Sequence, residues 1–140
     1  MRWVVPRNTA VCLFIALSAT ASGCRSKPAS VDDLFTARTL GLTYLQRNQL
    51  PEAEAQFKTL IELAPNDPVG YANLGLAYFQ GGRFAEAESR LLRARELDPA
   101  NTDVSLMLAK LYALTGRTAE ARTMLDKLNG GTKRDAHGQY

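Results

Sequence analysis

The sequence predicts an all-α fold, a solenoid built from three helical hairpins. A block of residues recurs at steps of 34: Leu40 to Tyr44 returns as Leu74 to Tyr78 and, more loosely, as Leu108 to Tyr112. Within each block the leucine and the tyrosine stand four residues apart, so that both lie on one face of a helix. Glycine and proline recur at matching places in the repeats, where helices are expected to end.

Each repeat is expected to hold two helices joined by a tight turn. The turns carry Asn48, Gly82 and Gly116, which tolerate the left-handed backbone that a helix end often needs. Pro65 and Pro99 close the second helix of their repeats, because proline cannot continue a helix. The expected repeats cover residues 34–67, 68–101 and 102–130, and the expected helices cover residues 31–47, 51–64, 68–80, 84–97, 102–115 and 118–129.

Small residues recur where the two helices of a repeat would meet. They are Ala53, Ala87 and Ala121 at one repeat position, and Gly41 and Gly75 at another. The distance between two packed helices depends on the side chains at their contact, so small residues here predict a close approach. Asp67 before Pro68 is typical of a helix start, with a capping side chain followed by a first-turn proline.

The 34-residue period and its pattern resemble the tetratricopeptide repeat family, whose repeat is a helix–turn–helix unit. The resemblance is fullest in the second repeat, at Tyr71, Leu74, Gly75, Tyr78, Gly82, Phe84, Ala87, Leu91, Ala94, Leu97 and Pro99. It implies a right-handed α-solenoid of three repeats over residues 32–130. It also implies a protein that binds other proteins and is not an enzyme.

The segment from Met1 to Cys24 is typical of an export signal. Arg2 and Arg7 precede an apolar stretch, residues 9–21, which is shorter than the roughly 20 apolar residues that span a bilayer. Ala21-Ser22-Gly23-Cys24 resembles the lipobox of bacterial lipoproteins. The resemblance implies that residues 1–23 are removed as a signal peptide and that Cys24 carries the lipid, palmitate included. Residues 24–31 would then form a tether.

Two alternatives to the lipid anchor stay open. Ala19-Thr20-Ala21 also fits ordinary signal peptidase, which would release a soluble periplasmic protein beginning at Ser22. An uncleaved apolar tail is disfavoured by the basic start and by the polar residues after Cys24. No Asp follows Cys24, which by resemblance favours the periplasmic face of the outer membrane over the inner membrane.

The charge balance and the cysteine positions limit what the domain can do and how it is held together. The chain has 17 Lys and Arg; without Arg2 and Arg7, 15 remain against 14 Asp and Glu, which gives no reason to expect nucleic acid. Both cysteines, Cys12 and Cys24, precede the expected domain, so we expect no disulfide within it. The domain must therefore be held together by packing.

Candidate residues for catalysis or metal binding are sparse. His137, the single histidine, falls in the expected tail. The acid pairs Glu52/Glu54 and Glu86/Glu88 are two residues apart, a spacing that does not bring side chains together on a helix. Arg83, Arg90, Arg93 and Arg95 make the second helix of the middle repeat basic, which we interpret as a solvated face with an acidic lipid or partner as the alternative. We expect no catalytic residue, metal site or cofactor.

The resemblance also places a binding surface. In this family the first helices of the repeats line a concave groove, along which ligands usually lie. Carried over by repeat position, the expected partner-binding residues are Arg38, Leu42, Leu45, Leu76, Phe79, Gln80, Leu106, Met107, Lys110 and Leu114. Each of them has the alternative of belonging to the core between repeats.

The expected ligand is an apolar or amphipathic segment of a protein partner. One branch of the family grips the terminal carboxylate of a peptide with basic residues and asparagines. Here Arg38 and Asn73 fit that scheme. Leu42, Asp103 and Met107 occupy the other expected places, and these residues would not hold a carboxylate.

The C-terminal end is expected to lack the extra helix that commonly caps such arrays. The last helix should stop near Asn129, because Gly130 and Gly131 follow, and residues 131–140 should form a disordered tail. The apolar residues Leu111, Met124 and Leu128 would then lie on an exposed flank. Self-association or the physiological partner would cover that flank.

Taken with the anchor, the repeats are similar to pilotin-type and pilus-assembly lipoproteins, and to helical-repeat lipoproteins of outer-membrane assembly. The resemblance implies a membrane-anchored scaffold or adaptor in pilus assembly, outer-membrane assembly or secretion. A soluble periplasmic adaptor is the alternative. An accessory to a peptidoglycan enzyme, or an enzyme itself, would need a catalytic constellation, and the sequence shows none.

Overall fold

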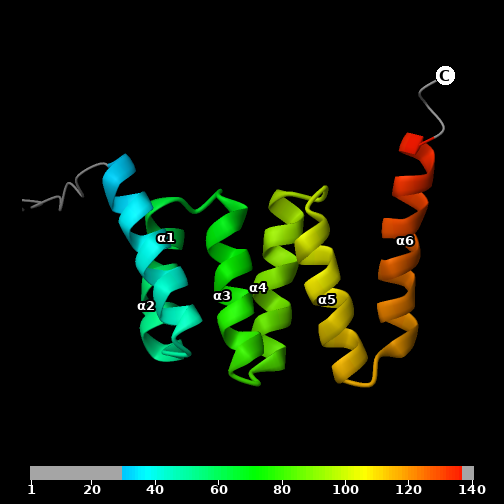
Figure 1. Ribbon diagram of the computed structural model, residues 1–140, viewed down its shortest axis with the longest axis horizontal. Helices are drawn as coiled ribbons and strands as arrows, with labels where there is room; N and C mark the ends of the chain where they lie inside the picture. Colours follow the sequence, from blue (N-terminus) through cyan, green and yellow to red (C-terminus); the bar gives the residue numbers. More distant parts are fainter. Residues whose placement is uncertain (1–29, 137–140) are drawn as a thin grey trace, which may run out of the picture.

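The computed structural model describes residues 30–136, which form six α-helices and no strand (Figure 1). The helices are α1 (Val31–Gln46), α2 (Leu50–Leu63), α3 (Pro68–Gln80), α4 (Phe84–Leu97), α5 (Thr102–Leu114) and α6 (Thr118–Ala136). Each helix packs mainly on its neighbours in the chain, and α1 and α5 also touch α3. The result is a row of three hairpins, which confirms the all-α solenoid of helical repeats.

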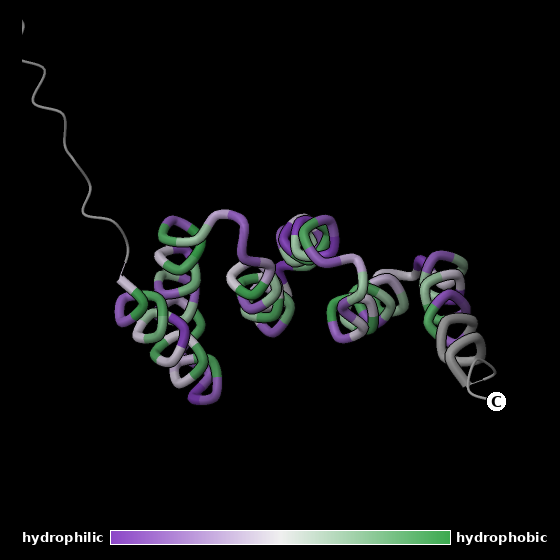
Figure 2. Tube along the Cα trace, turned by 90° about the horizontal axis from the view of Figure 1, so that it is seen from above, coloured by the Kyte–Doolittle hydropathy of each residue, from purple (hydrophilic) through white to green (hydrophobic). Residues whose placement is uncertain are grey.

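The core runs through the row as a stripe of equivalent positions. Figure 2 shows the row from above, with hydrophobic and hydrophilic residues mixed on each helix. Leu74 and Leu108 from the first helices are fully buried, as are Phe57 and Leu91 from the second helices. Because these four residues form two pairs, each related by the repeat period, each junction repeats the packing of the one before it.

The predicted close approach between helices is confirmed at the small residues. Ala53, Ala87 and Ala121 are all buried. A Cβ atom added to Gly41 would come within 2.5 Å of Cε1 of Phe57, so glycine is required for α1 and α2 to pack at this distance.

The helix ends follow the predicted signals. Asp67 accepts a hydrogen bond from the backbone N–H of Val69 at 2.9 Å, which caps the start of α3. Asn48, Gly82 and Gly116 have positive φ angles of 56°, 72° and 80°, the left-handed conformation predicted for the turns. The observed helix bounds lie within one residue of those predicted at every end except the last.

The last helix extends further toward the C-terminus than the sequence predicted. Helix α6 continues through Gly130 and Gly131 to Ala136, so the predicted stop near Asn129 is wrong, and residues 131–136 are helical. A glycine inside a helix costs about 1 kcal/mol relative to alanine but keeps its backbone hydrogen bonds, so two glycines weaken a helix without ending it. The remaining tail residues, 137–140, lie outside the described part of the chain, as do the predicted signal peptide, Cys24 and residues 25–29.

The predicted exposed flank also needs correction. Leu111 is 1% exposed and belongs to the core. Met124 and Leu128 are half-buried, and with Arg95 of α4 and Ser105 of α5 they line a small depression. Leu125, which the sequence analysis did not select, is the exposed leucine of α6.

Candidate functional site

The first helices of the three repeats carry the predicted partner-binding residues. Five of them are exposed, and we call these five residues the first-helix surface: Arg38, Gln80, Leu106, Lys110 and Leu114. Leu106, Lys110 and Leu114 follow one another at intervals of four along α5, so they form one exposed stripe. This stripe combines two apolar side chains with a cation between them.

The other predicted residues are divided between this surface and the core. Leu42, Leu76, Phe79 and Met107 are half-buried and pack against the core. The ring of Phe79 meets that of Phe84 edge to face, with centroids 5.8 Å apart, which fixes the turn between α3 and α4. Leu45 is buried in the core, so its assignment as a lining residue is wrong.

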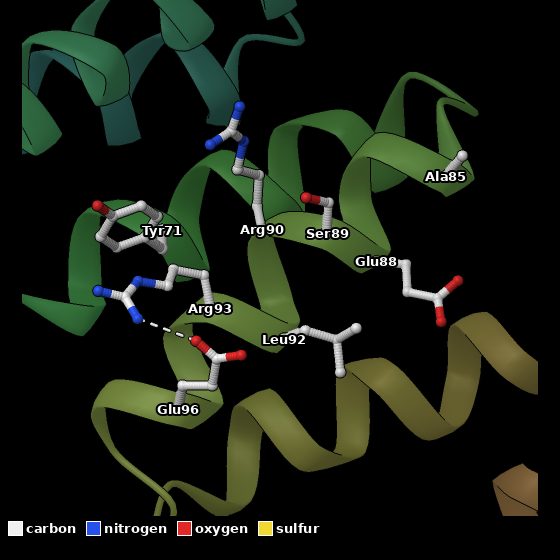
Figure 3. Close-up of a pocket in the computed structure, with 8 residues that line it drawn as sticks. All are labelled: Tyr71, Ala85, Glu88, Ser89, Arg90, Leu92, Arg93 and Glu96. Carbon is white, nitrogen blue, oxygen red and sulfur yellow. Dashed lines mark hydrogen bonds and ion pairs between the residues drawn. The ribbon is translucent and has the colours of Figure 1, made fainter.

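A depression of about 700 Å³ lies along α4 (Figure 3). Its lining comes from α4 and from Tyr71 of α3: Tyr71, Ala85, Glu88, Ser89, Arg90, Leu92, Arg93 and Glu96. Ala85, Ser89, Leu92 and Glu96 recur at helical spacing on one side of α4, whereas Ala87, Leu91 and Ala94 on its other side are in the core. The depression therefore lies on the outer face of the second helix.

The charges in this depression are largely satisfied within the chain. Nη1 of Arg93 donates to Oε2 of Glu96 at 2.9 Å, and its guanidinium lies 5.9 Å from the ring centroid of Tyr71. Glu88 is bound by Arg117 of the next repeat. In Figure 3 Arg90 points away from Arg93, toward the first hairpin. This mixture of paired acids and bases supports our interpretation of a solvated face.

A cluster of charged and aromatic side chains joins the first repeat to the second. Glu54 of α2 accepts from the hydroxyl of Tyr78 at 2.9 Å and from Nη1 of Arg83 at 2.6 Å. The guanidinium of Arg83 lies 4.2 Å from the centroid of the Tyr78 ring and also donates to Glu86 through Nε, at 2.6 Å. Lys58 adds a third cation-to-acid contact, 2.7 Å from Oε1 of Glu54.

The same cluster recurs one repeat later, between the second and third repeats. Nη1 of Arg117 donates to both carboxylate oxygens of Glu88 at 2.8 Å, and its Nε donates to Glu120 at 2.6 Å. The guanidinium lies 4.1 Å from the centroid of the Tyr112 ring. We call these two sets, Glu54/Tyr78/Arg83/Glu86 and Glu88/Tyr112/Arg117/Glu120, the junction clusters.

The junction clusters shift the pKa values of their members in the directions that favour ion pairing. Partial burial alone would raise the pKa of Glu54, but hydrogen bonds from Lys58, Tyr78 and Arg83 outweigh it and lower that pKa to about 2. Glu86 and Glu54 raise the pKa of Arg83. Burial and the neighbouring Glu54 raise the pKa of the Tyr78 hydroxyl. These groups keep one charge state near neutral pH, which suits a structural role and not proton transfer.

The junction clusters were not among the predicted features, although the repeat period contains a signal for them. Arg83 and Arg117 share a repeat position, as do Glu54 and Glu88, and as do Glu86 and Glu120. From the sequence we expected no contact within the acid pairs Glu52/Glu54 and Glu86/Glu88, and we interpreted Arg83 as part of a solvated basic face. Charged residues of opposite sign that recur with the repeat period indicate contacts between repeats.

The described helices fit neither a membrane span nor a metal centre. Within residues 30–136, no helix combines the length with the apolar composition needed to cross a membrane. The described residues also contain no gathering of three or more histidine, cysteine, aspartate or glutamate side chains suited to a metal ion. The predicted lipidation site, Cys24, lies outside the described residues.

Comparison with known families identifies the repeats. The family described as "Tetratricopeptide repeat" matches residues 78–139, and the one described as "TPR repeat" matches residues 41–81. A solved structure, that of a mutant of MamA, is 31% identical, with a TM-score of 0.63, over 71% of this chain and 72% of that one. This chain belongs to the tetratricopeptide repeat family. A search of the curated proteins found no significant match.

Two other solved TPR structures resemble this TPR chain. The TPR2B domain of yeast Sti1, solved as a complex with pHsp70, is 25% identical, with a TM-score of 0.62, over 75% of this chain and 90% of that one. The type III secretion translocator chaperone SycD of Yersinia enterocolitica is 22% identical, with a TM-score of 0.66, over 69% and 73% of the two chains. TPR proteins are generally non-catalytic scaffolds for protein–protein interaction, and this chain has the fold of that family.

Proposed function

We propose that this TPR chain is a membrane-anchored scaffold of the bacterial envelope, which binds a protein partner on its first-helix surface. The observation that carries the proposal is the stripe of Leu106, Lys110 and Leu114 on α5. Leu114 is 64% exposed and Leu106 is 40% exposed, while their helix is otherwise held by buried residues. Exposed leucines in a line on a well-packed helix are typical of a docking surface.

The stripe suits an amphipathic segment of the partner. Such a segment would set apolar side chains against the two leucines and an acidic side chain against Lys110. Arg38 of α1 adds a second cation on the same set of helices. The exposed Asp103 at the start of α5 opposes a terminal carboxylate there, so we propose that the partner is recognised through an internal segment.

The TPR neighbours support peptide binding in a general way. The yeast Sti1 domain was solved with pHsp70, which shows that a domain of similar fold accepts a protein ligand. In this chain the exposed stripe consists of two leucines and a lysine. We therefore propose the same type of interaction with a largely apolar ligand.

The anchor part of the proposal rests on Gly23-Cys24 after the short apolar stretch. Residues 24–30 precede α1, and a segment of this length spans at most about 25 Å when fully extended. Lipid on Cys24 would therefore hold the repeats close to the membrane surface. Pilus assembly, outer-membrane assembly and secretion are the processes that we propose for such a scaffold; cleavage after Ala21 would instead give a soluble periplasmic adaptor.

Photo-crosslinking from single positions tests the binding surface. A photoreactive residue would replace Leu106 or Leu114 in the whole chain, expressed in its native membranes. Ala85 and Ser89, which are exposed on the outer face of α4, provide matched control positions. We expect one common adduct from the two α5 positions and none from α4. Adducts from α4 alone would contradict the proposed surface.

A further inference from the structure

The two ends of the array leave uncovered the positions that are buried inside it. Leu91 of α4 is fully buried, whereas Leu125, its equivalent one repeat later in α6, is 41% exposed. Leu74 of α3 is 1% exposed, whereas its equivalent Leu40 in α1 is 40% exposed. Each end therefore carries an exposed leucine where an internal junction would bury one.

At both ends of the array, residues of different charge occupy positions that belong to the junction clusters inside it. The acid position of the clusters, Glu54 and Glu88, becomes Arg122 in α6. The arginine position, Arg83 and Arg117, becomes Gln49 ahead of α2. The tyrosine is kept as Tyr44, and the second acid is kept as Glu52.

These changes determine which unit can follow α6. A further repeat of the internal type would bring its arginine against Arg122, and two like charges would repel. The first repeat of this chain brings Gln49, Tyr44 and Glu52 to the same place. Glutamine and tyrosine can accept hydrogen bonds from a guanidinium, and Glu52 supplies the opposite charge.

From this complementarity we infer that a second copy of the chain docks head to tail, with its α1 on α6 of the first copy. The register is that of the internal junction between α2 and α3. A depression of about 800 Å³ along α6, lined in part by Ala121, Arg122 and Leu125, receives α1 and its Leu40. The inference does not depend on the proposed partner surface or on the anchor.

The lengths of the terminal helices agree with this arrangement. Both terminal helices are longer than their equivalents inside the array. Helix α1 begins at Val31, before residue 34, which is the position equivalent to the start of α3. Helix α6 ends at Ala136, after residue 131, which is the position equivalent to the end of α4. Figure 1 shows both extensions rising at the same edge of the row. In a head-to-tail joint they run beside each other and lengthen the contact.

The contact is heterologous, because two different surfaces meet. One surface of each copy stays open after the first joint, so the same joint can form again. Association should therefore grow with concentration and produce a series of species, not a closed dimer. On a membrane, such a series would arrange first-helix surfaces in rows.

Reciprocal charge variants test the joint and its register. In Arg122→Glu the new acid faces Gln49 and Glu52 of the next copy; in Gln49→Arg the new cation faces Arg122. Each variant alone should associate roughly tenfold more weakly than the unchanged chain, which is a change of about 1.4 kcal/mol. A mixture of the two variants sets the new acid on α6 of one copy against the new cation ahead of α2 of the other. This pair reproduces the internal pair of Glu88 and Arg117, so the mixture should regain the unchanged affinity.

The measurement is energy transfer between two differently labelled samples of the whole chain in detergent, over a range of concentrations. Arg122 and Gln49 are exposed, and circular dichroism should show unchanged helicity in both variants. Glu62→Arg, an exposed charge reversal on α2, is the control that should leave association unchanged. No association of the unchanged chain, or no recovery in the mixture, would overturn the inference. Stronger association of Arg122→Glu alone would do so too, since it would indicate α6 meeting α6.

Discussion

Arg83 and Arg117 occupy the same position in neighbouring repeats and hold two successive junctions in the same way. Each guanidinium lies about 4 Å from the centre of a tyrosine ring and pairs with a glutamate of the preceding repeat. Each also binds a second glutamate, one helical turn further along its own repeat. The packing of leucines and alanines thus has a polar counterpart with the same period.

Removing one of these arginines should loosen the junction that it spans. Arg117→Met keeps an apolar stem but loses the pairing with Glu88 and the stacking on Tyr112, so the thermal midpoint should fall. Thermal denaturation followed by circular dichroism measures the change. Lys127→Met, at an exposed position of α6, is the matched control and should leave the midpoint nearly unchanged. Equal midpoints in both variants would show that the junction cluster adds nothing to stability.

Glu54 makes stability depend on acid. Its pKa is about 2 in the folded chain, against an ordinary value of 4.5, so the unfolded chain takes up its proton first as the pH falls. The stabilisation is complete above pH 4.5 and is lost as the pH falls toward 2. Its side chain is 19% exposed, so we expect a contribution of about 1–3 kcal/mol after allowance for solvent screening.

The variant Glu54→Gln isolates that contribution. It should be less stable than the unchanged chain at pH 7, and the difference should shrink as the pH falls from 4.5 to 2. Urea denaturation at a series of pH values gives the free energies of unfolding. A difference that stays constant across this range would mean that the carboxylate of Glu54 is not specifically stabilised.

The contact between the two helices of the middle repeat is sensitive to size. Ala87 is fully buried, so Ala87→Leu should overpack this contact and lower the free energy of unfolding by about 1–3 kcal/mol. Ala85→Leu adds the same side chain on the exposed face of α4 and should change little. Denaturant unfolding distinguishes the two. If Ala87→Leu were as stable as its control, the register of the repeats would be wrong.

The anchor prediction concerns residues before the described part of the chain. Cys24→Ser should abolish incorporation of labelled palmitate and release the protein from membranes. Mass spectrometry of the unchanged protein should give an N-terminal Cys24 that carries lipid. Such an anchor provides more than one acyl chain, which is enough for stable attachment to the membrane. A mature protein that begins at Ser22 without lipid would establish the soluble alternative.

The sequence predicted the fold well because local and repeated signals agreed. Asp67, Pro68 and the left-handed turn residues mark helix ends, and the absence of a side chain at Gly41 leaves room for the ring of Phe57. Helix α6 was misjudged at its end, because the two glycines lower helix stability without preventing the helix.

The candidate site was harder to predict, because burial at a repeat position depends on what lies on either side. Leu45 was predicted to lie on the binding surface and Leu111 on the exposed flank, because both are apolar. Neighbouring helices cover both of them. The junction clusters join residues 29 positions apart, and such pairs become visible only when charges are compared between repeats. Leu125 is exposed because the described chain has no repeat beyond α6.

The measurement that tests the central claim most directly is partner binding by variants of the first-helix surface. The partner found by crosslinking would be titrated against Leu106→Glu and Leu114→Glu, with Ala85→Glu on α4 as the control. We expect each α5 variant to weaken binding at least roughly tenfold, about 1.4 kcal/mol, with unchanged helicity, and the control to bind as the unchanged chain does. Full binding by both α5 variants, or a loss of binding confined to Ala85→Glu, would contradict the claim that this TPR scaffold holds its partner on the first helices.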